Sequence, residues 1–540
     1  MKKIIALLLG LTLVISLVSI GFSSSHMDSE KYGGKIVEAI REEPDTLDVH
    51  ETTRFVTIQM TSYALEPLFT LNPDFEVIPL LVDSYSWSDD KLTMTINLKQ
   101  GVMFHNGEEM TSEDVKVSYE RYLENSPLAN YLPGRKGGIT EINTPDKYTV
   151  VLKLKNPKPL AMYILADPHM TIMPADWLNN TPEKDIGRTE LIGTGPLKFV
   201  NWNPGDSITF ERFEDYHHGP AYLENQGPAY AEEWVVKIVP EESTRIATVT
   251  AGDTDVTFHL PPKFVKSVSA HPNAVAKTDP TYGVQYMSMN SQKEPLTNKN
   301  VRVAIAHAVN KDAIVKAAWN GVGFKIYGLI NEATVGYWPG IKDVAYKYDL
   351  EKAKELLEGE GWVDSDGDGI REKDGKELAL TLITFSTLDQ WKLAGEIIQA
   401  QLKDLGVKIK LETAEVGAIY DRANSGDYDL AITKNMWWLG QPYLNFLTHP
   451  ENIGSSNYGR WENPELGRLI EEAGNALKAE DREEALNEVQ RMVVESGIWV
   501  PLVARTWRMA AKNSLGGISE LRAHPWWPSL IKPLVLYQKS

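Results

Sequence analysis

Polar and apolar residues alternate along several short segments in the first half of the chain, which predicts half-buried β-strands. These segments are 35–40, 91–98, 148–154, 197–202, 207–213 and 233–239. Apolar residues three or four positions apart indicate helices at 58–68 and after Ser243. Thr111 and Asp114 have the spacing of a capping box, so another helix should begin there.

From about residue 300 onward the pattern changes to alternating helices and strands. A strand is expected at 378–384, a helix at 390–405 and a strand at 407–413. This order makes a β-α-β unit, whose two strands should be parallel. A further strand is expected at 429–433. The chain has no internal repeat and no low-complexity linker, so packed lobes are expected.

Composition narrows the class of protein. The 540 residues suggest two to four domains. Lys and Arg number 55 against 74 Asp and Glu, a net charge of −19, which argues against binding to nucleic acid or to an anionic membrane surface. Because the chain has no Cys, it has no disulfide, no thiolate metal site, no Cys nucleophile and no thioether lipid anchor.

The first 25 residues have the pattern of a secretory signal peptide. Lys2 and Lys3 precede an apolar run that ends near Ile20 and is followed by small residues. Phe22 stands where a bacterial lipoprotein would carry its Cys, so the protein is not expected to be a lipoprotein. We therefore expect a soluble, exported protein in the periplasm or another extracytoplasmic space, with the cut between Gly21 and Met27.

No catalytic motif is recognisable. The mature chain has no G-x-S-x-G, H-E-x-x-H, P-loop or G-x-G-x-x-G pattern at a strand-to-helix turn. Catalysis and a cofactor are therefore not expected. The pair His217-His218 is adjacent rather than helically spaced, so a solvated loop is expected there. An exported glycosidase stays open as an alternative, because a catalytic carboxylate pair could be hidden among the acidic residues.

The segment 364–375 begins like a calcium-binding loop. Acidic residues at positions 1, 3 and 5 are followed by Gly at position 6, as such loops require. The residues concerned are Asp364, Asp366, Asp368 and Gly369, with Glu372 at position 9. The twelfth position, which should be a bidentate Glu, is Gly375. A weak calcium site and a plain acidic turn are the two interpretations.

A set of short segments in consistent order resembles the family 5 extracellular solute-binding proteins of ABC importers. The most characteristic is Leu98-Lys99-Gln100-Gly101-Val102-Met103-Phe104-His105-Asn106-Gly107. The matching segments are 80–90, 98–107, 110–115, 195–196, 252–255, 301–310, 364–375, 454–458, 463–464 and 500–502. The resemblance covers nearly all of the mature chain.

The resemblance implies an α/β, two-lobed periplasmic-binding-protein fold of type II, in its large form with an inserted domain. Lobe one would combine 33–75, 190–285 and 505–540, the inserted domain would span 76–189, and lobe two would span 286–504. The lobes would close about a hinge on a ligand held between them, and the closed form would then meet the permease subunits in the membrane. A monomer is the expected state.

By the same resemblance, the ligand would touch three loops, at 50–55, 258–260 and 435–443. The candidate ligand-binding residues are Thr53, Phe55, His259, Asn435, Trp437, Trp438, Gln441 and Tyr443. Peptide-binding relatives commonly carry an Asp at the place of Trp438, where it binds the peptide α-amino group. Trp cannot neutralise an ammonium, whereas its flat face suits a sugar ring. The residues therefore favour an oligosaccharide ligand, with an oligopeptide or dipeptide as the alternative.

Overall fold

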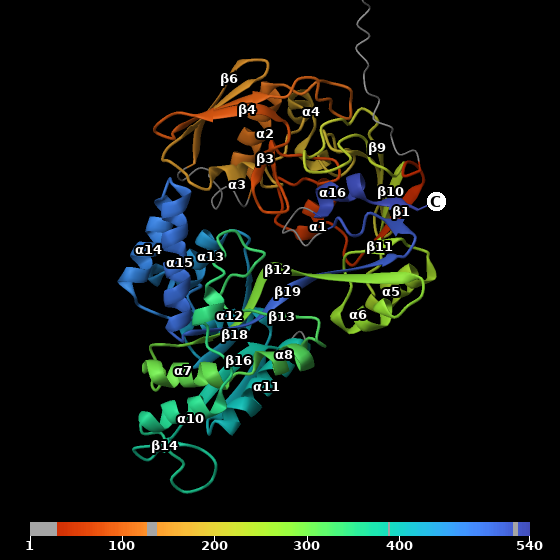
Figure 1. Ribbon diagram of the computed structural model, residues 1–540. Coiled ribbons are helices and arrows are strands. Elements are labelled where there is room, and N and C mark those ends of the chain that lie inside the picture. The colour runs from red at the N-terminus through yellow and green to blue at the C-terminus, as the bar shows by residue number, and fades with distance from the viewer. Residues whose placement is uncertain (1–29, 127–137, 387–388, 522–527, 540) are drawn as a thin grey trace, which may run out of the picture.

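Residues 30–126, 138–386, 389–521 and 528–539 are described by a computed structural model (Figure 1). The predicted signal peptide lies outside these residues. In the described part of the chain, no helix combines the length and the apolar character needed to cross a membrane.

The largest sheet has eleven strands. They are β1 (Lys35–Ile40), β8 (Leu197–Asn203), β9 (Ser207–Arg212), β10 (Glu233–Ile238), β11 (Val256–Thr257), β12 (Ala274–Met289), β13 (Phe324–Lys325), β16 (Ala379–Phe385), β17 (Lys408–Ala414), β18 (Leu430–Met436) and β19 (Trp499–Lys512). Their order is β17-β16-β18-β12-β19-β11-β1-β10-β9-β8, and β13 pairs with β19 beside this path.

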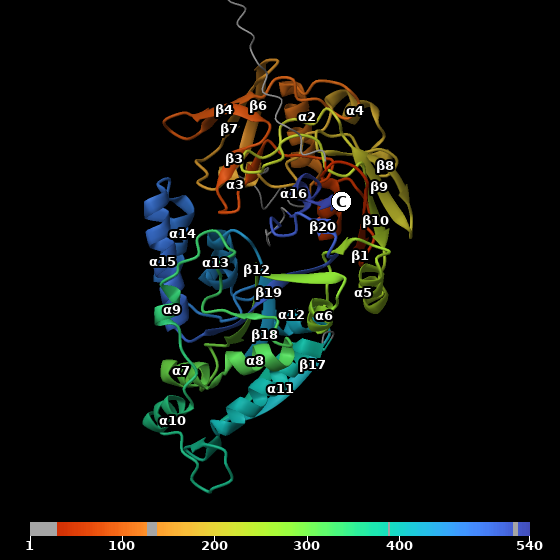
Figure 2. The same ribbon diagram turned by 45° about the vertical axis from the view of Figure 1, so that its right-hand side comes forward.

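The long strands β12 and β19 join two lobes. They pair antiparallel, with a register shift between Pro280 and Val284. Both views show them running from the upper body of the molecule into the lower one (Figures 1 and 2). Met509 of β19 belongs to the buried cluster of β1 and β10, whereas Leu502 belongs to the cluster of β16 and β18. One continuous strand is therefore anchored in two separate cores.

A separate four-stranded antiparallel sheet lies above the first lobe (Figure 1). Its strands, in the order β4-β5-β7-β6, are β4 (Val82–Trp87), β5 (Thr93–Leu98), β7 (Thr149–Leu154) and β6 (Ile139–Asp146). Three two-stranded sheets complete the strands: β2 (Phe69–Leu71) with β3 (Val77–Pro79), β14 (Glu372–Lys373) with β15 (Lys376–Glu377), and β20 (Leu515–Gly516) with β21 (Tyr537–Gln538).

Helices pack around these sheets. The α-helices are α1 (Phe55–Thr61), α2 (Ser112–Asn125), α3 (Ala161–Leu165), α4 (Ala175–Asn180), α5 (Glu242–Ala251), α6 (Pro262–Ser269), α7 (Lys299–Ala308), α8 (Lys311–Ala318), α9 (Ile341–Val344), α10 (Leu350–Gly359), α11 (Asp389–Asp404), α12 (Val416–Ser425), α13 (Gly440–Thr448), α14 (Pro464–Asn475), α15 (Ala479–Glu495) and α16 (Pro528–Val535). Two short 3₁₀ helices are η1 (Glu183–Asp185) and η2 (Pro450–Asn452).

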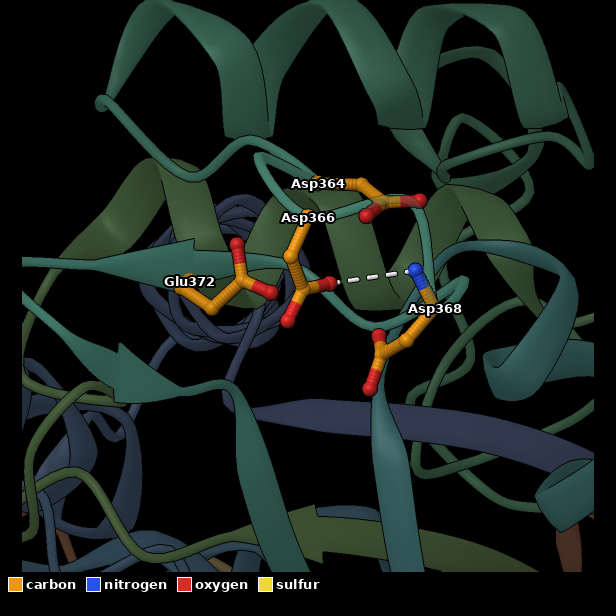
Figure 3. Close-up of side chains that lie close together, drawn as sticks. All are labelled: Asp364, Asp366, Asp368 and Glu372. Atoms are coloured by element: carbon orange, nitrogen blue, oxygen red, sulfur yellow. Dashed lines mark hydrogen bonds between the residues drawn. The ribbon is translucent and has the colours of Figure 1, made fainter.

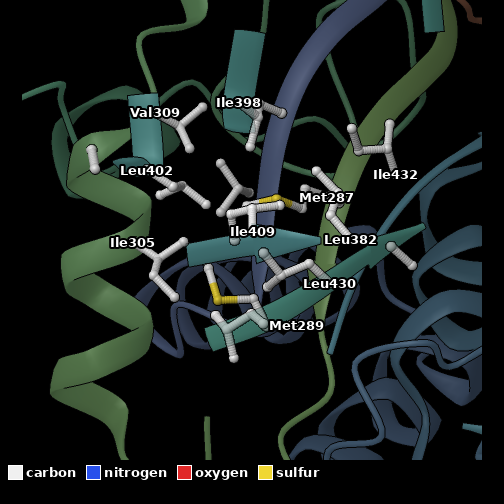
Figure 4. Packing of buried hydrophobic residues seen from close by; sticks show 14 of the residues in the cluster. Met287, Met289, Ile305, Val309, Leu382, Ile398, Leu402, Ile409, Leu430 and Ile432 are labelled. Atoms are coloured by element: carbon white, nitrogen blue, oxygen red, sulfur yellow. The ribbon is translucent and has the colours of Figure 1, made fainter. Parts of the chain in front are cut away.

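The core of the lower lobe follows from the predicted β-α-β unit. β16 and β17 pair in parallel, as expected, with α11 between them in sequence. Leu382, Ile398 and Leu430 are fully buried and pack with Met287 of β12 (Figure 4). Burying such side chains stabilises a fold by about 1.5–3 kcal/mol each.

Two local predictions differ in outcome. The capping box is confirmed: the Asp114 carboxylate accepts from the Thr111 N–H at 2.7 Å, and α2 begins at the next residue. The helix expected at 58–68 is wrong in its bounds, because α1 ends at Thr61. Pro67 disfavours a helical conformation for the residue before it, and Phe69 is drawn into β2.

Two contacts between polar groups join distant segments of the upper body. Lys532 of α16 and Glu38 of β1 are both inaccessible to solvent and form an ion pair at 3.3 Å. His105 connects the inserted sheet to the loop 193–195: one ring nitrogen lies 2.9 Å from the Gly195 carbonyl, and the other accepts from the Gly193 N–H. Burial lowers the pKa of His105 from 6.5 to about 4, so the ring is neutral.

Candidate functional site

The three predicted ligand-binding loops follow strands that lie close together in the main sheet. The loops follow β1, β11 and β18, which belong to the run β18-β12-β19-β11-β1. His259, just after β11, forms an isolated parallel bridge with Arg508 of β19. Asn435 of β18 pairs with Val284 of β12. The loops after β11 and β18 therefore border the segment where β12 and β19 pass between the lobes.

The predicted side chains differ in how accessible they are. Thr53 and Phe55 are exposed at the start of α1, and His259, Asn435 and Trp437 are half-buried. Burial lowers the pKa of His259 well below its ordinary value, and the nearby positive charge of Arg41 lowers it further. His259 is therefore a neutral hydrogen-bonding group at the lobe junction.

The other three predicted residues are engaged within the fold. The Gln441 amide donates to the Ile470 carbonyl at 3.0 Å. Tyr443 is fully buried, and its hydroxyl has no partner among the described residues. Trp438 is 3% exposed and belongs to the buried cluster of the inserted domain, where its ring meets Tyr163 of α3 edge-on at 5.7 Å. Trp438 thus connects the loop after β18 to the inserted domain.

Sequence patterns did not identify a group of positively charged residues at the same junction. Arg41 follows β1, Lys434 lies on β18, and Arg505 and Arg508 lie on β19. We call these four residues the junction cations. They are separated by up to several hundred positions along a chain of net charge −19, so no local signal points to them.

A cavity of about 730 Å³ lies elsewhere, between the inserted sheet and the loop 217–226. Asp83, Lys99, Tyr148 and His218 contribute to its lining, and none of the predicted ligand-binding residues does. The expected solvated loop at His217-His218 is wrong for the second residue. His218 is buried, 2.8 Å from the Glu66 carboxylate, because Glu66 is itself fully buried and needs donors.

The acidic loop after α10 has the predicted shape. Carboxylate oxygens of Asp364, Asp366, Asp368 and Glu372 lie within 4.8 Å of one another, and all four side chains surround one turn (Figure 3). Three of these carboxylates are exposed. Both oxygens of Asp364 already accept backbone N–H groups, at 2.7 and 3.1 Å. The loop therefore folds on its own hydrogen bonds, and calcium binding there stays a prediction.

Comparisons with known proteins place this geometry in context. Residues 76–455 match the family model described as bacterial extracellular solute-binding proteins, family 5 Middle. The oligopeptide-binding protein AppA of Bacillus subtilis is 26% identical over 97% of this chain and 98% of its own length. The glutathione-binding protein GsiB of Salmonella paratyphi A is 25% identical over 93% of this chain and 95% of its own.

A solved structure shows the same fold. HbpA2 from Haemophilus parasuis superposes with a TM-score of 0.80 at 22% identity, over 94% of this chain and all of that one. The predicted α/β fold with two lobes, of the type II periplasmic-binding class, is therefore confirmed.

Proposed function

The chain belongs to the bacterial extracellular solute-binding proteins of family 5, and on that premise we propose that it captures a short peptide between its two lobes. It is the substrate-binding component of an ABC importer. The observation that carries the peptide proposal is the likeness to an oligopeptide-binding protein along 97% of the chain.

The reason for preferring a sugar is weakened by the structure. That preference rested on the flat face of Trp438, which would stack on a pyranose ring. The ring is instead 3% exposed and packed on Tyr163. A sugar could use this face only after the loop and α3 had parted, so Trp438 no longer favours a sugar over a peptide.

The proposed mechanism is closure about β12 and β19. We assign 33–75, 190–285 and 505–540 to lobe one, 76–189 to the inserted domain and 286–504 to lobe two. The register shift between Pro280 and Val284 interrupts the long ladder near the boundary between lobes, which is where a hinge can bend with little loss of pairing. A peptide that touches both lobes then favours the closed form through its higher affinity for it.

The remaining assignments complete the cycle of transport. The closed, loaded monomer would meet the permease subunits at the membrane after residues 1–25 have been removed as a signal peptide. Thr53, Phe55, His259, Asn435 and Trp437 are proposed to contact the ligand, because they stay exposed or half-buried, whereas the other predicted residues are engaged within the fold.

A calorimetric titration tests the proposal. A mixture of di- to pentapeptides should release or absorb heat on binding, whereas cello- and manno-oligosaccharides should not. Heat with the sugars alone would overturn the peptide assignment. Mass spectrometry of the recovered ligand tests the glycosidase alternative, because an enzyme would return shorter products and a binding protein would return the ligand intact.

A further inference from the structure

A second cavity lies in the second lobe, away from the loops predicted to bind the solute. It measures about 250 Å³ and is bordered by the loop after β12, by α7 and by the loop before α14. Arg302, Arg460, Gln292 and Glu462 contribute to its lining, and none of the predicted ligand-binding residues does. The end of β12 beside this cavity lies roughly 17 Å along the strand from the register shift, at about 3.4 Å per residue.

The cavity is lined by a buried arginine with one unused nitrogen. Arg302 of α7 is 6% exposed. Its Nε donates to the Ser496 carbonyl at 3.2 Å, and its Nη1 donates to the carbonyls of Leu296 and Thr297 at 2.7 and 2.9 Å. Its Nη2 has no hydrogen-bond partner among the residues that the structure describes. Nη2 is therefore the part of the guanidinium that is left to face the cavity.

The positive charge of Arg302 also lacks a countercharge. Its three hydrogen bonds all go to backbone carbonyls, and within the described ranges it forms no salt bridge. Burial is the largest influence on the pKa of Arg302 and lowers it. A buried cation without a carboxylate partner is expected to respond in this way, because burial penalises the charged form.

Arg460 supplies a second guanidinium to the same cavity. The side chain is half-buried; its Nε donates to the Gln292 amide oxygen at 3.0 Å, and its Nη1 donates to the Asn424 carbonyl at 3.2 Å. Its Nη2 again has no partner in the described part of the chain. The backbone φ of Arg460 is 50°, in the left-handed region that favours glycine, so an arginine at this position costs conformational energy.

Gln292 separates the one carboxylate of the lining from the arginines. Its amide nitrogen donates to Glu462 at 2.8 Å, while its amide oxygen accepts from Arg460. Glu462 forms no salt bridge with Arg302 or with Arg460. The cavity thus offers two guanidinium groups, each with a free Nη2, and no carboxylate that neutralises either.

We propose that this cavity binds a small tetrahedral oxyanion of the phosphate or sulfate class, held by the free Nη2 groups of Arg302 and Arg460. Guanidinium groups bind such anions through charge-assisted hydrogen bonds. A tetrahedral anion presents oxygens in several directions, which suits two donors that come from different segments. The volume lies below the roughly 300–1,000 Å³ of pockets that hold larger organic ligands, so the occupant is a small ion.

The ion is a free one rather than a phosphate of a lipid headgroup. The net charge of −19 disfavours approach to an anionic membrane surface. A bound oxyanion would connect α7 to the loop that carries Arg460, so it would stabilise the second lobe with or without solute between the lobes.

Calorimetry and thermal unfolding test the site. The purified protein, in a buffer free of phosphate and sulfate, is titrated with sodium phosphate or sodium sulfate at constant ionic strength. Saturable heat from one site is expected, together with a Tm that rises with the concentration of the oxyanion. Sodium chloride at the same ionic strength should produce neither effect, which separates binding from screening.

Variants locate the binding. Arg460→Gln should raise the dissociation constant for phosphate by about 10- to 100-fold, because a charged hydrogen bond is lost. Glu462→Gln removes the carboxylate beside the site and should lower the constant by up to about 5-fold. The control, Arg468→Gln on α14, removes an exposed arginine paired with Glu465 and Glu472 and should leave the constant unchanged.

Three results would overturn the assignment. They are the absence of saturable binding of both phosphate and sulfate, an unchanged affinity in folded Arg460→Gln, and an equal loss of affinity in Arg468→Gln. If Arg460→Gln does not fold, Glu462→Gln decides: tighter binding supports the site, and unchanged or weaker binding overturns it. Failure of the peptide titration is a separate result, because none of the residues proposed to contact the solute lines this cavity.

Discussion

Replacing Trp438 by Ala should loosen the contact between the second lobe and the inserted domain. The Trp438 side chain is 3% exposed, and its ring packs against that of Tyr163 of α3. A buried Trp covers roughly 150–250 Å² and its truncation costs about 3–5 kcal/mol. Because the contact joins separate parts of the molecule, we expect most of this cost in the balance between engaged and parted lobes. A change of about 3 kcal/mol shifts such a balance by roughly 100-fold.

Small-angle scattering of the ligand-free protein measures this shift directly. The radius of gyration of Trp438→Ala should exceed that of the unmodified protein, and peptide affinity should fall because a smaller fraction is ready to close. The matched control is Trp461→Ala, since Trp461 packs within the second lobe against Trp499 and its loss leaves the interlobe contact intact. Equal scattering profiles and equal affinities for Trp438→Ala would show that this ring does not hold the second lobe to the inserted domain.

Three further predictions concern stability, each measured by urea unfolding. The pKa of His105 is depressed to about 4 in the folded chain, so the unfolded chain binds a proton first as the pH falls below 6.5. The free energy of unfolding should therefore fall by about 2 kcal/mol between pH 8 and pH 5 because of His105 alone. In His105→Gln, the decrease over the same pH range should be smaller by this amount. Lys532→Met leaves the buried Glu38 carboxylate unpaired and should cost about 3–5 kcal/mol, while adding Glu38→Gln should recover part of it. Leu382→Ala, in the core of the lower lobe, should cost about 2–5 kcal/mol, and a loss below 1 kcal/mol would contradict its placement.

Sequence patterns predicted correctly those features that depend on interactions between residues close together in the sequence. The capping box requires only that Thr111 and Asp114 lie three positions apart in the sequence, and the structure contains it. The β-α-β unit around α11 depends on periodicity within about 35 residues, and its two strands are parallel as expected.

Features that depend on distant segments were missed. His218 is adjacent to an exposed His217, and nothing nearby in sequence indicates that Glu66, 152 positions away, draws it into the interior. Trp438 was expected to contact the ligand because the resemblance places it where peptide-binding relatives carry an Asp, but Tyr163 of α3, in the inserted domain, covers its ring.

The junction cations show the same limit for the site. They lie just after β1, on β18 and on β19, and composition reports only a strongly acidic chain. Their proximity arises from the strand order β18-β12-β19-β11-β1, which is a property of the whole fold. The family resemblance predicted three ligand-binding loops, whereas the positive charge between them became visible only in the structure.

Closure on an intact solute can be measured by scattering with and without peptide. A bound peptide should reduce the radius of gyration of the unmodified protein and should be recovered with its mass unchanged. Superimposable profiles at saturating peptide, or recovery of the peptide in fragments, would contradict a binding protein that closes on its solute.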